Sequence, residues 1–241
     1  MTEESSDHHS IQNLKGVGPK SATSLNNLGI FTIPDAAFHL PFRYEDRSFI
    51  TSISEANYQT PVLIEGEIMK STVVFRGRRM LFSEIYDGTG RLTMRMFNFA
   101  MAQHKALEEG KMIRCFGTIT PGPKGKQMIH PQYQVFEKDD SIEVEKNLTP
   151  IYPTTSGLQQ NKLKKIIESS LEFCDKNNLL KEESKNKQYS EYGNLLETLK
   201  FLHKPPVETN ISELIEGKHP AQQSLIKEEL IAHMLCAGIL K

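Results

Sequence analysis

The sequence predicts an α+β fold in which a small β-barrel is flanked, along the chain, by helical segments. Apolar residues recur at helical spacing before residue 41 and after residue 156. Between residues 61 and 137 the pattern changes to short apolar runs and alternations of period 2, separated by glycine-containing turns. The chain has 241 residues, of which 38% are hydrophobic, so it is long enough for one large or two small globular domains.

The first ten residues, 1–10, are polar and acidic, and we expect them to form a disordered leader. They lack the apolar core of a signal peptide, and no later segment approaches the roughly 18 apolar residues of a membrane-spanning helix. The three cysteines lie far apart, so neither a disulfide framework nor a zinc site is indicated. We therefore expect a cytoplasmic protein without a membrane partner or a metal site.

Residues 11–56 are predicted to form a helical segment that begins with a tight glycine turn. Gly16 and Gly18 stand just before Pro19 and Lys20, where a helix with apolar residues at helical spacing begins. This pattern is typical of a helix-hairpin-helix, whose turn offers backbone N–H groups to a DNA phosphate. Gly16, Gly18 and Lys20 are therefore candidate phosphate contacts. A purely structural joint between two helices is the alternative.

Residues 57–147 are predicted to form the barrel. Three strands, a short helix over 100–107 and two further strands follow one another, which is the order of an OB-fold. An OB-fold is a five-stranded Greek-key barrel whose ligand face combines strands two and three with the loops that join strands one to two and four to five. The five strands are expected at 62–75, 80–86, 91–99, 112–120 and 128–136.

The third predicted strand has two unlike faces, because alternate residues of a strand share a face. One face is apolar and is expected in the core; it carries Leu92, Met94 and Met96. The other face combines guanidinium groups, which pair with phosphates, and phenyl rings, which stack on unpaired bases. We expect this second face to bind nucleic acid; it carries Arg91, Thr93, Arg95, Phe97 and Phe99. The turn that follows could instead rotate Phe99 into the core.

Both predicted ligand-binding loops are basic. The formal net charge of the chain is −1, so a nucleic-acid site must be a local patch. Residues 61–140 contain 12 Lys and Arg against 9 Asp and Glu, and five of these cations lie in the two loops. The alternative is that these turns are merely solvated. The candidate phosphate contacts are Arg76, Arg78 and Arg79 in the first loop, and Lys124 and Lys126 in the second.

Residues 148–241 are predicted to form a helical connector. An apolar stripe runs along residues 163–174, and the last helix begins near Pro220 and has no stop signal before Lys241. This suggests that a partner surface, and further chain, are absent. The sequence has no phosphate-binding Gly-x-x-x-x-Gly-Lys-Ser/Thr loop, and its histidines are scattered. We therefore expect no catalytic residues and no cofactor in this chain.

Eight short motifs, in order along nearly the whole chain, resemble the N-terminal part of the RecG family of bacterial branched-DNA helicases. They include the glycine turn, the Arg/Phe strand with the turn before it, and several proline-containing motifs. The matching segments are residues 14–19, 39–47, 77–80, 87–99, 128–133, 152–155, 202–206 and 219–222.

The resemblance implies that the barrel is a wedge that binds branched DNA, such as replication forks and Holliday junctions, in recombination and repair. It also implies that Phe97 stacks at the branch point, with Phe99 second. Met96 stands where relatives can carry another aromatic residue. The helicase motor, with its ATP and magnesium, is expected after Lys241, so this chain would be a motor-less, nucleoid-associated monomer. A stand-alone OB-fold module for single-stranded DNA or RNA is the alternative.

Overall fold

The computed structural model describes residues 9–140, 142–180 and 194–239. Residues 1–8, which are most of the expected disordered leader, lie outside the described residues. The chain divides into two compact units. Residues 1–45 and 147–241 form a helical unit, and residues 46–146 form a barrel unit.

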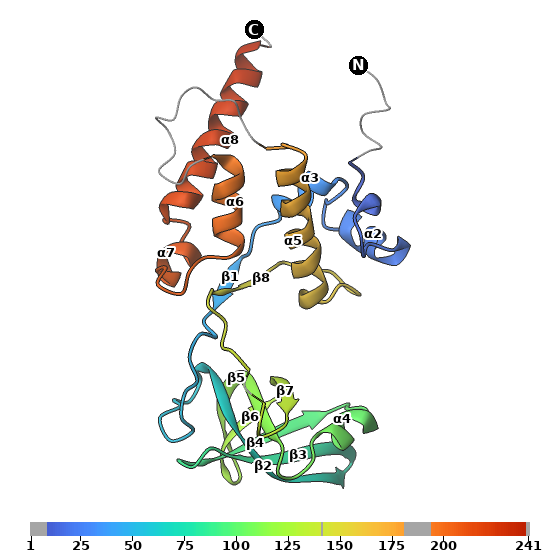
Figure 1. The fold of residues 1–241 in the computed structure, drawn as a ribbon, viewed down its shortest axis with the longest axis vertical. Helices are drawn as coiled ribbons and strands as arrows, with labels where there is room; N and C mark the ends of the chain where they lie inside the picture. Colours follow the sequence, from blue (N-terminus) through green and yellow to red (C-terminus); the bar gives the residue numbers. More distant parts are fainter. Residues whose placement is uncertain (1–8, 141, 181–193, 240–241) are drawn as a thin grey trace. The chain divides into compact units, whose positions relative to one another are not determined.

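The helical unit combines the two ends of the chain (Figure 1). The first segment contributes a 3₁₀ turn, two short helices and a strand, and the second contributes the partner strand and four helices. Strands β1 and β8 pair antiparallel, and α6 and α8 lie side by side. The elements are η1 (Ile11–Asn13), α2 (Pro19–Asn26), α3 (Ile33–Ala37), β1 (Arg43–Glu45), β8 (Thr149–Ile151), α5 (Gln160–Lys176), α6 (Leu195–His203), α7 (Ile211–Ile215) and α8 (Pro220–Ile239).

One apolar core joins these two segments. Ile11, Leu25 and Ile33 of the first segment share a buried cluster with Leu163 and Ile167 of α5. Short helices are not stable alone in water and depend on tertiary packing. Residues 1–45 and 147–241, which the sequence assigned to separate segments at 11–56 and 148–241, therefore bury their apolar faces against each other.

The helix starts follow the sequence signals. Gly18 is the N-cap of α2 and Pro19 is its first residue. Thr32 caps α3 through a capping box, in which its side chain accepts a hydrogen bond from the backbone N–H of Asp35. The element before the glycine turn, η1, is only a three-residue 3₁₀ turn. The apolar stripe predicted at 163–174 is buried along α5.

A buried polar network ties the strands of the helical unit to α6. The Tyr44 hydroxyl donates to the Leu202 carbonyl oxygen (2.7 Å). The imidazole of His203 is held on both sides, by the Tyr152 hydroxyl at Nδ1 (3.0 Å) and by the Ala37 carbonyl oxygen at Nε2 (2.8 Å). Burial lowers the pKa of His203 to about 4, so this imidazole is neutral in the folded protein near pH 7.

The barrel unit is a mixed sheet with one short helix. The sheet order is β2-β3-β4-β6-β5-β7, and an additional pairing of β2 with β5 closes the sheet on itself. All pairings are antiparallel except that of β4 with β6. The elements are β2 (Pro61–Arg76), β3 (Arg78–Tyr86), β4 (Arg91–Phe97), α4 (Met101–Ala106), β5 (Met112–Gly122), β6 (Gly125–Ile129) and β7 (Gln132–Phe136).

The sheet has six strands among the described residues, where the sequence predicted five. The expected strand at 128–136 is divided at His130, which has a left-handed φ of 49°, and at Pro131. The first part, β6, pairs with β4 and β5, whereas β7 pairs with the other end of β5. Proline lacks the N–H that a strand interior requires, which explains the break. None of the helices in the described residues is long and apolar enough to cross a membrane.

Candidate nucleic-acid interface

Strand β4 has the two faces that its sequence predicts. Leu92, Met94 and Met96 are buried in the barrel core, at 1%, 1% and 4% exposure. The intervening side chains, from Arg91 to Phe97, are exposed or half-buried. The outer face of β4 is therefore available to a ligand.

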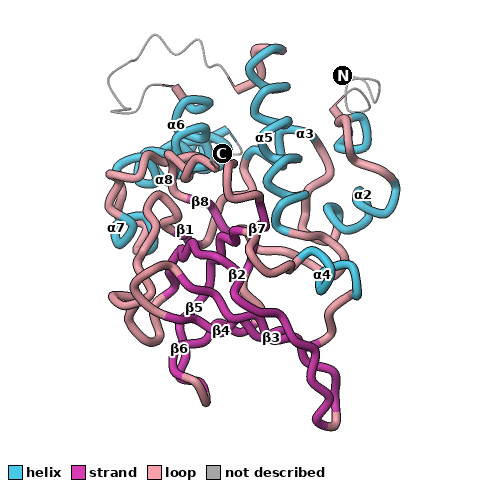
Figure 2. Tube along the Cα trace, turned by 60° about the horizontal axis from the view of Figure 1, so that its bottom comes forward, coloured by secondary structure: helices cyan, strands magenta, loops and turns pink. Residues whose placement is uncertain are grey.

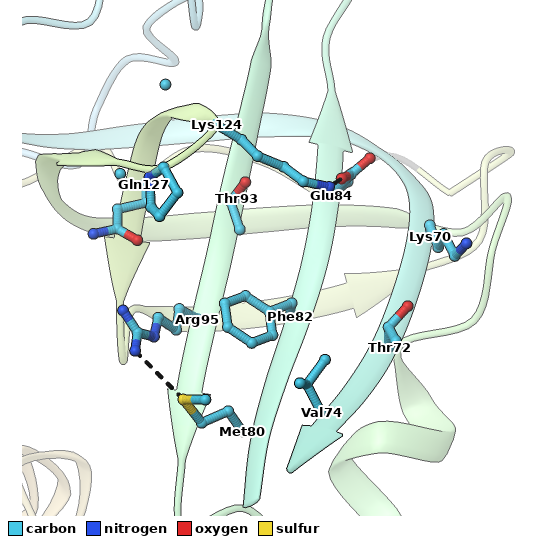
Figure 3. A pocket seen from close by; sticks show the side chains of 13 residues that line it. Lys70, Thr72, Val74, Met80, Phe82, Glu84, Thr93, Arg95, Lys124 and Gln127 are labelled. Atoms are coloured by element: carbon cyan, nitrogen blue, oxygen red, sulfur yellow. Dashed lines mark hydrogen bonds and ion pairs between the residues drawn. The ribbon is translucent and has the colours of Figure 1, made fainter. Parts of the chain in front are cut away.

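Arginine and aromatic side chains alternate across the outer face of the sheet. Arg95 on β4 lies opposite Phe82 on β3, and its guanidinium carbon is 5.5 Å from the Phe82 ring centroid and 4.7 Å from that of Phe97. Its Nη2 also lies 3.4 Å from the Met80 sulfur. Figure 3 shows Arg95 beside Phe82, with Thr93 next to Arg95 along β4.

The Phe97 ring is held from two sides but remains half-exposed. The guanidinium carbon of Arg78 lies 3.8 Å from its centroid, so Arg78 and Arg95 both make cation–π contacts with it. The ring of His130 lies 5.3 Å away at an interplanar angle of 55°, and its Nε2 accepts a hydrogen bond from the Phe97 backbone N–H (3.2 Å). Phe97 is thus an oriented ring between two cations.

The arginine loop is the tip of the β2–β3 hairpin. Arg76 pairs with Arg78 around Gly77, whose φ of 73° is a conformation that favours glycine. Arg78 and Arg79 are exposed, and the side chain of Arg76 lies outside the described part of the structure. Figure 2 shows this hairpin running beyond the rest of the sheet to its tip.

Phe99 does not continue the outer face; it lies beside the core, which is the alternative position that the sequence left open. Strand β4 ends at Phe97, and Asn98 has a left-handed φ of 48°, which interrupts the alternation. The half-buried Phe99 ring packs against the barrel core, and the Arg79 guanidinium carbon lies 4.7 Å from its centroid. Phe99 therefore belongs to the edge of the core.

The cations of the second loop have different surroundings. Lys124 is 73% exposed and binds Glu84, which also faces Arg91 at 3.7 Å. The hydrogen bond from Lys124 lowers the pKa of the Glu84 carboxyl, which stays charged and offsets part of the local positive charge. Lys126 instead donates to the carbonyl oxygens of Ile53 (2.6 Å) and Ser54 (2.8 Å). Its ammonium thus holds a loop onto the barrel.

A groove of about 430 Å³ runs along the outer face. Phe82 and Arg95 lie in its middle, the apolar side chains of Val74 and Met80 are at one end, and the Glu84–Lys124 pair is towards the other (Figure 3). A base can stack on such apolar and guanidinium surfaces, and the exposed cations at the rim can pair with phosphates. The groove lies on the outer face of β3 and β4, beside the loop between β5 and β6.

The remaining predicted contacts lie in the helical unit. Gly16 (φ 92°), Gly18 and Lys20 are exposed around the start of α2. A Cβ atom on either glycine would meet nothing within 4 Å, so the turn is open to solvent on that side. The backbone there is accessible to solvent, and the phosphate contact stays a prediction.

Phe75 was not predicted from the sequence as a site residue, although it lies next to Arg76. It is 74% exposed, at the tip of the β2–β3 hairpin. In the sequence it reads as the last apolar residue of a strand, which is usually packed. The length of β2 could have identified Phe75, because a strand this long extends past the part of the barrel that can cover it.

A family model described as the RecG wedge domain matches residues 10–174. The chain belongs to the RecG wedge domain family. It is 38% identical over 228 residues to the ATP-dependent DNA helicase RecG of Escherichia coli (strain K12), a match that covers 93% of this chain and 32% of that protein. The RecG helicases of Haemophilus influenzae (39% over 228 residues) and Pasteurella multocida (36% over 235 residues) match similarly.

These matches confirm the resemblance to RecG, and their coverage gives the share of a RecG protein that this chain spans. The chain spans about a third of the length of these three RecG relatives, 32% to 34%. A solved structure of RecG bound to a three-way DNA junction superposes with a TM-score of 0.68 at 24% identity, covering 82% of this chain and 27% of that one. This superposition shows that the two chains share a fold.

Proposed function

We propose that this chain is the branched-DNA-binding wedge of a RecG-type helicase that acts in recombination and repair. The observation that carries the proposal is the Phe97 ring, which is half-exposed and oriented between the guanidinium groups of Arg78 and Arg95. A phenyl ring in this setting can cap the last base pair at a branch point, and the adjacent guanidinium groups can pair with the phosphates of the same nucleotides.

The phosphate contacts that we propose follow the charges of the outer face. Arg78 and Arg95 flank Phe97, whereas Lys124 and Arg91 gather around Glu84, further along the face. Arg76 and Arg79, at the hairpin tip, are two further phosphate contacts that we propose, separate from the outer-face set. These contacts position the DNA without reading its sequence. Lys126 is left out of this set because its ammonium is bound to two backbone carbonyls.

We also propose that the barrel unit is an OB-fold and that the glycine turn of the helical unit contacts DNA. Strands β2, β3, β4, β6 and β5, closed by the β2–β5 pairing, follow the strand order of an OB barrel, with β7 as an added edge strand. The turn at 14–18 with α2 would serve as a reduced helix-hairpin-helix and offer the backbone of Gly16 and Gly18, with Lys20, to a phosphate. The ligand of this glycine turn would be a phosphate in one of the duplex arms of the junction.

ATP hydrolysis belongs, in this proposal, to the part of the RecG relatives that the chain does not span. The sequence contains no phosphate-binding loop with the spacing that holds nucleotide and magnesium, so the residues of this chain do not fit those groups. The wedge would act passively. It would separate strands while the motor pulls the duplex, and the chain alone would bind DNA without turnover.

Substrate preference tests the proposal. We expect this chain to bind a three-way junction more tightly than a plain duplex or a single strand of equal length in a gel-shift titration. Affinity should fall with salt, because cations that pair with phosphates release counterions. Equal or tighter binding of the single strand would favour the stand-alone single-strand module instead. Binding that is absent at all salt concentrations would reject both functions.

A further inference from the structure

The β2–β3 hairpin has two different faces at its tip. Directly paired residues share a face, and neighbours along each strand alternate between faces. Val74 therefore lies with Met80, its partner, on the outer face, where Met80 also pairs with Phe97. Phe75 pairs with Arg79 on the opposite face.

Ring contacts confirm this division. Arg78 stacks over Phe97, which is on the outer face, whereas Arg79 stacks over Phe99, which packs against the core on the inner side. The two adjacent arginines thus point to opposite sides of a ribbon only two strands wide. Each side has its own pairing of guanidinium and phenyl groups.

Phe75 extends the inner face beyond the barrel. Val73 and Leu81, one step earlier on the same face, still pack in or against the core. The hairpin then continues past the end of the barrel (Figure 2), and Phe75 is 74% exposed there. Burial of a phenylalanine ring is favourable, so the fold leaves a large apolar side chain in solvent next to cationic positions.

A single DNA strand cannot contact both faces of this hairpin unless it wraps around the tip. A branch point supplies two strands that diverge, one for each side. We propose that Phe75 and Arg79 form a second nucleic-acid contact, on the face opposite Phe97, that takes an unpaired nucleotide of the strand that Phe97 does not hold. The base stacks on the Phe75 ring, and Arg79 pairs with its phosphate. This inference rests on the function proposed above.

The test uses the whole chain and a three-way junction with 2-aminopurine next to the branch point in one strand or in the other. The wild-type protein should change the fluorescence of both probes. Phe75→Ala should abolish the response of one probe and keep the other, and Phe97→Ala should do the reverse. Each variant should weaken junction binding roughly 5- to 150-fold, as expected for the loss of one stacked base.

Phe49→Ala is the matched control, because Phe49 is also an exposed phenylalanine of the barrel unit (58%) but lies outside the hairpin. It should leave both probes and the affinity unchanged. This inference alone would be overturned if Phe75→Ala kept the wild-type junction affinity and both fluorescence responses while Phe97→Ala lost affinity and one response. It would also be overturned if both variants lost the fluorescence response of the same probe. A wild-type chain with no preference for the junction would reject the proposed function and this inference together.

Discussion

Replacing Lys126 and Lys124 one at a time separates a structural cation from a ligand-binding one. Lys126 donates to the Ile53 and Ser54 carbonyl oxygens at 2.6 and 2.8 Å, and Ile53 is 1% exposed in the barrel core. Lys126→Ala leaves these two acceptors without their charged donor. Removing such a donor lowers the free energy of unfolding by about 1–3 kcal/mol. Because the site is partly exposed, we expect a decrease in the lower half of that range.

Lys124 offers the matched comparison in the same loop. It is 73% exposed and pairs with Glu84 on the surface, so Lys124→Ala should change the free energy of unfolding by less than about 1 kcal/mol. Its loss should instead weaken junction binding and reduce the slope of log affinity against log salt by about one, the effect of one phosphate contact.

Differential scanning calorimetry and fluorescence anisotropy on a labelled junction measure the two effects. The prediction is a lower melting temperature with a near-normal salt slope for Lys126→Ala, and a normal melting temperature with a reduced slope for Lys124→Ala. The opposite assignment, in which Lys126→Ala unfolds like the wild type but loses affinity, would refute the reasoning from the two carbonyl contacts.

Two further predictions concern stability. Phe99→Ala should lower the free energy of unfolding by about 1–3 kcal/mol in chemical denaturation, because the ring packs against the barrel core; an unchanged stability with a lost junction affinity would return Phe99 to the binding face. His203 has a folded-state pKa of about 4, below its ordinary value of 6.5, so the unfolded state binds more protons between these values. Stability should therefore fall as the pH drops from about 6.5 to 4, by up to about 1.4 kcal/mol per pH unit. His203→Gln should flatten this dependence, and an equally steep profile in the variant would exclude His203 as its source.

The sequence predicted the parts of the barrel that depend on local periodicity. The alternation of β4 placed Leu92, Met94 and Met96 in the core because a strand with one buried face must keep a period of two. Phe99 departed from this pattern because one residue, Asn98, takes a left-handed conformation. An apolar/polar pattern does not encode that change.

Long-range contacts account for the other differences. Nothing near Lys126 in the sequence indicates that carbonyls more than 70 residues away would bind its ammonium. The shared core of the helical unit likewise joins segments that are separated by the whole barrel. Phe75 was overlooked because its exposure depends on where the hairpin leaves the barrel, which is a property of the closed sheet.

The affinity of the Phe97→Ala variant for a three-way junction, measured beside its melting temperature, tests the central claim most directly. The oriented ring between Arg78 and Arg95 should contribute roughly 1–3 kcal/mol of stacking, so affinity should fall roughly 5- to 150-fold. The melting temperature should stay close to that of the wild type, since the ring lies on the outer face. A wild-type affinity, or a large loss of melting temperature, would contradict the assignment of Phe97 as the branch-point contact.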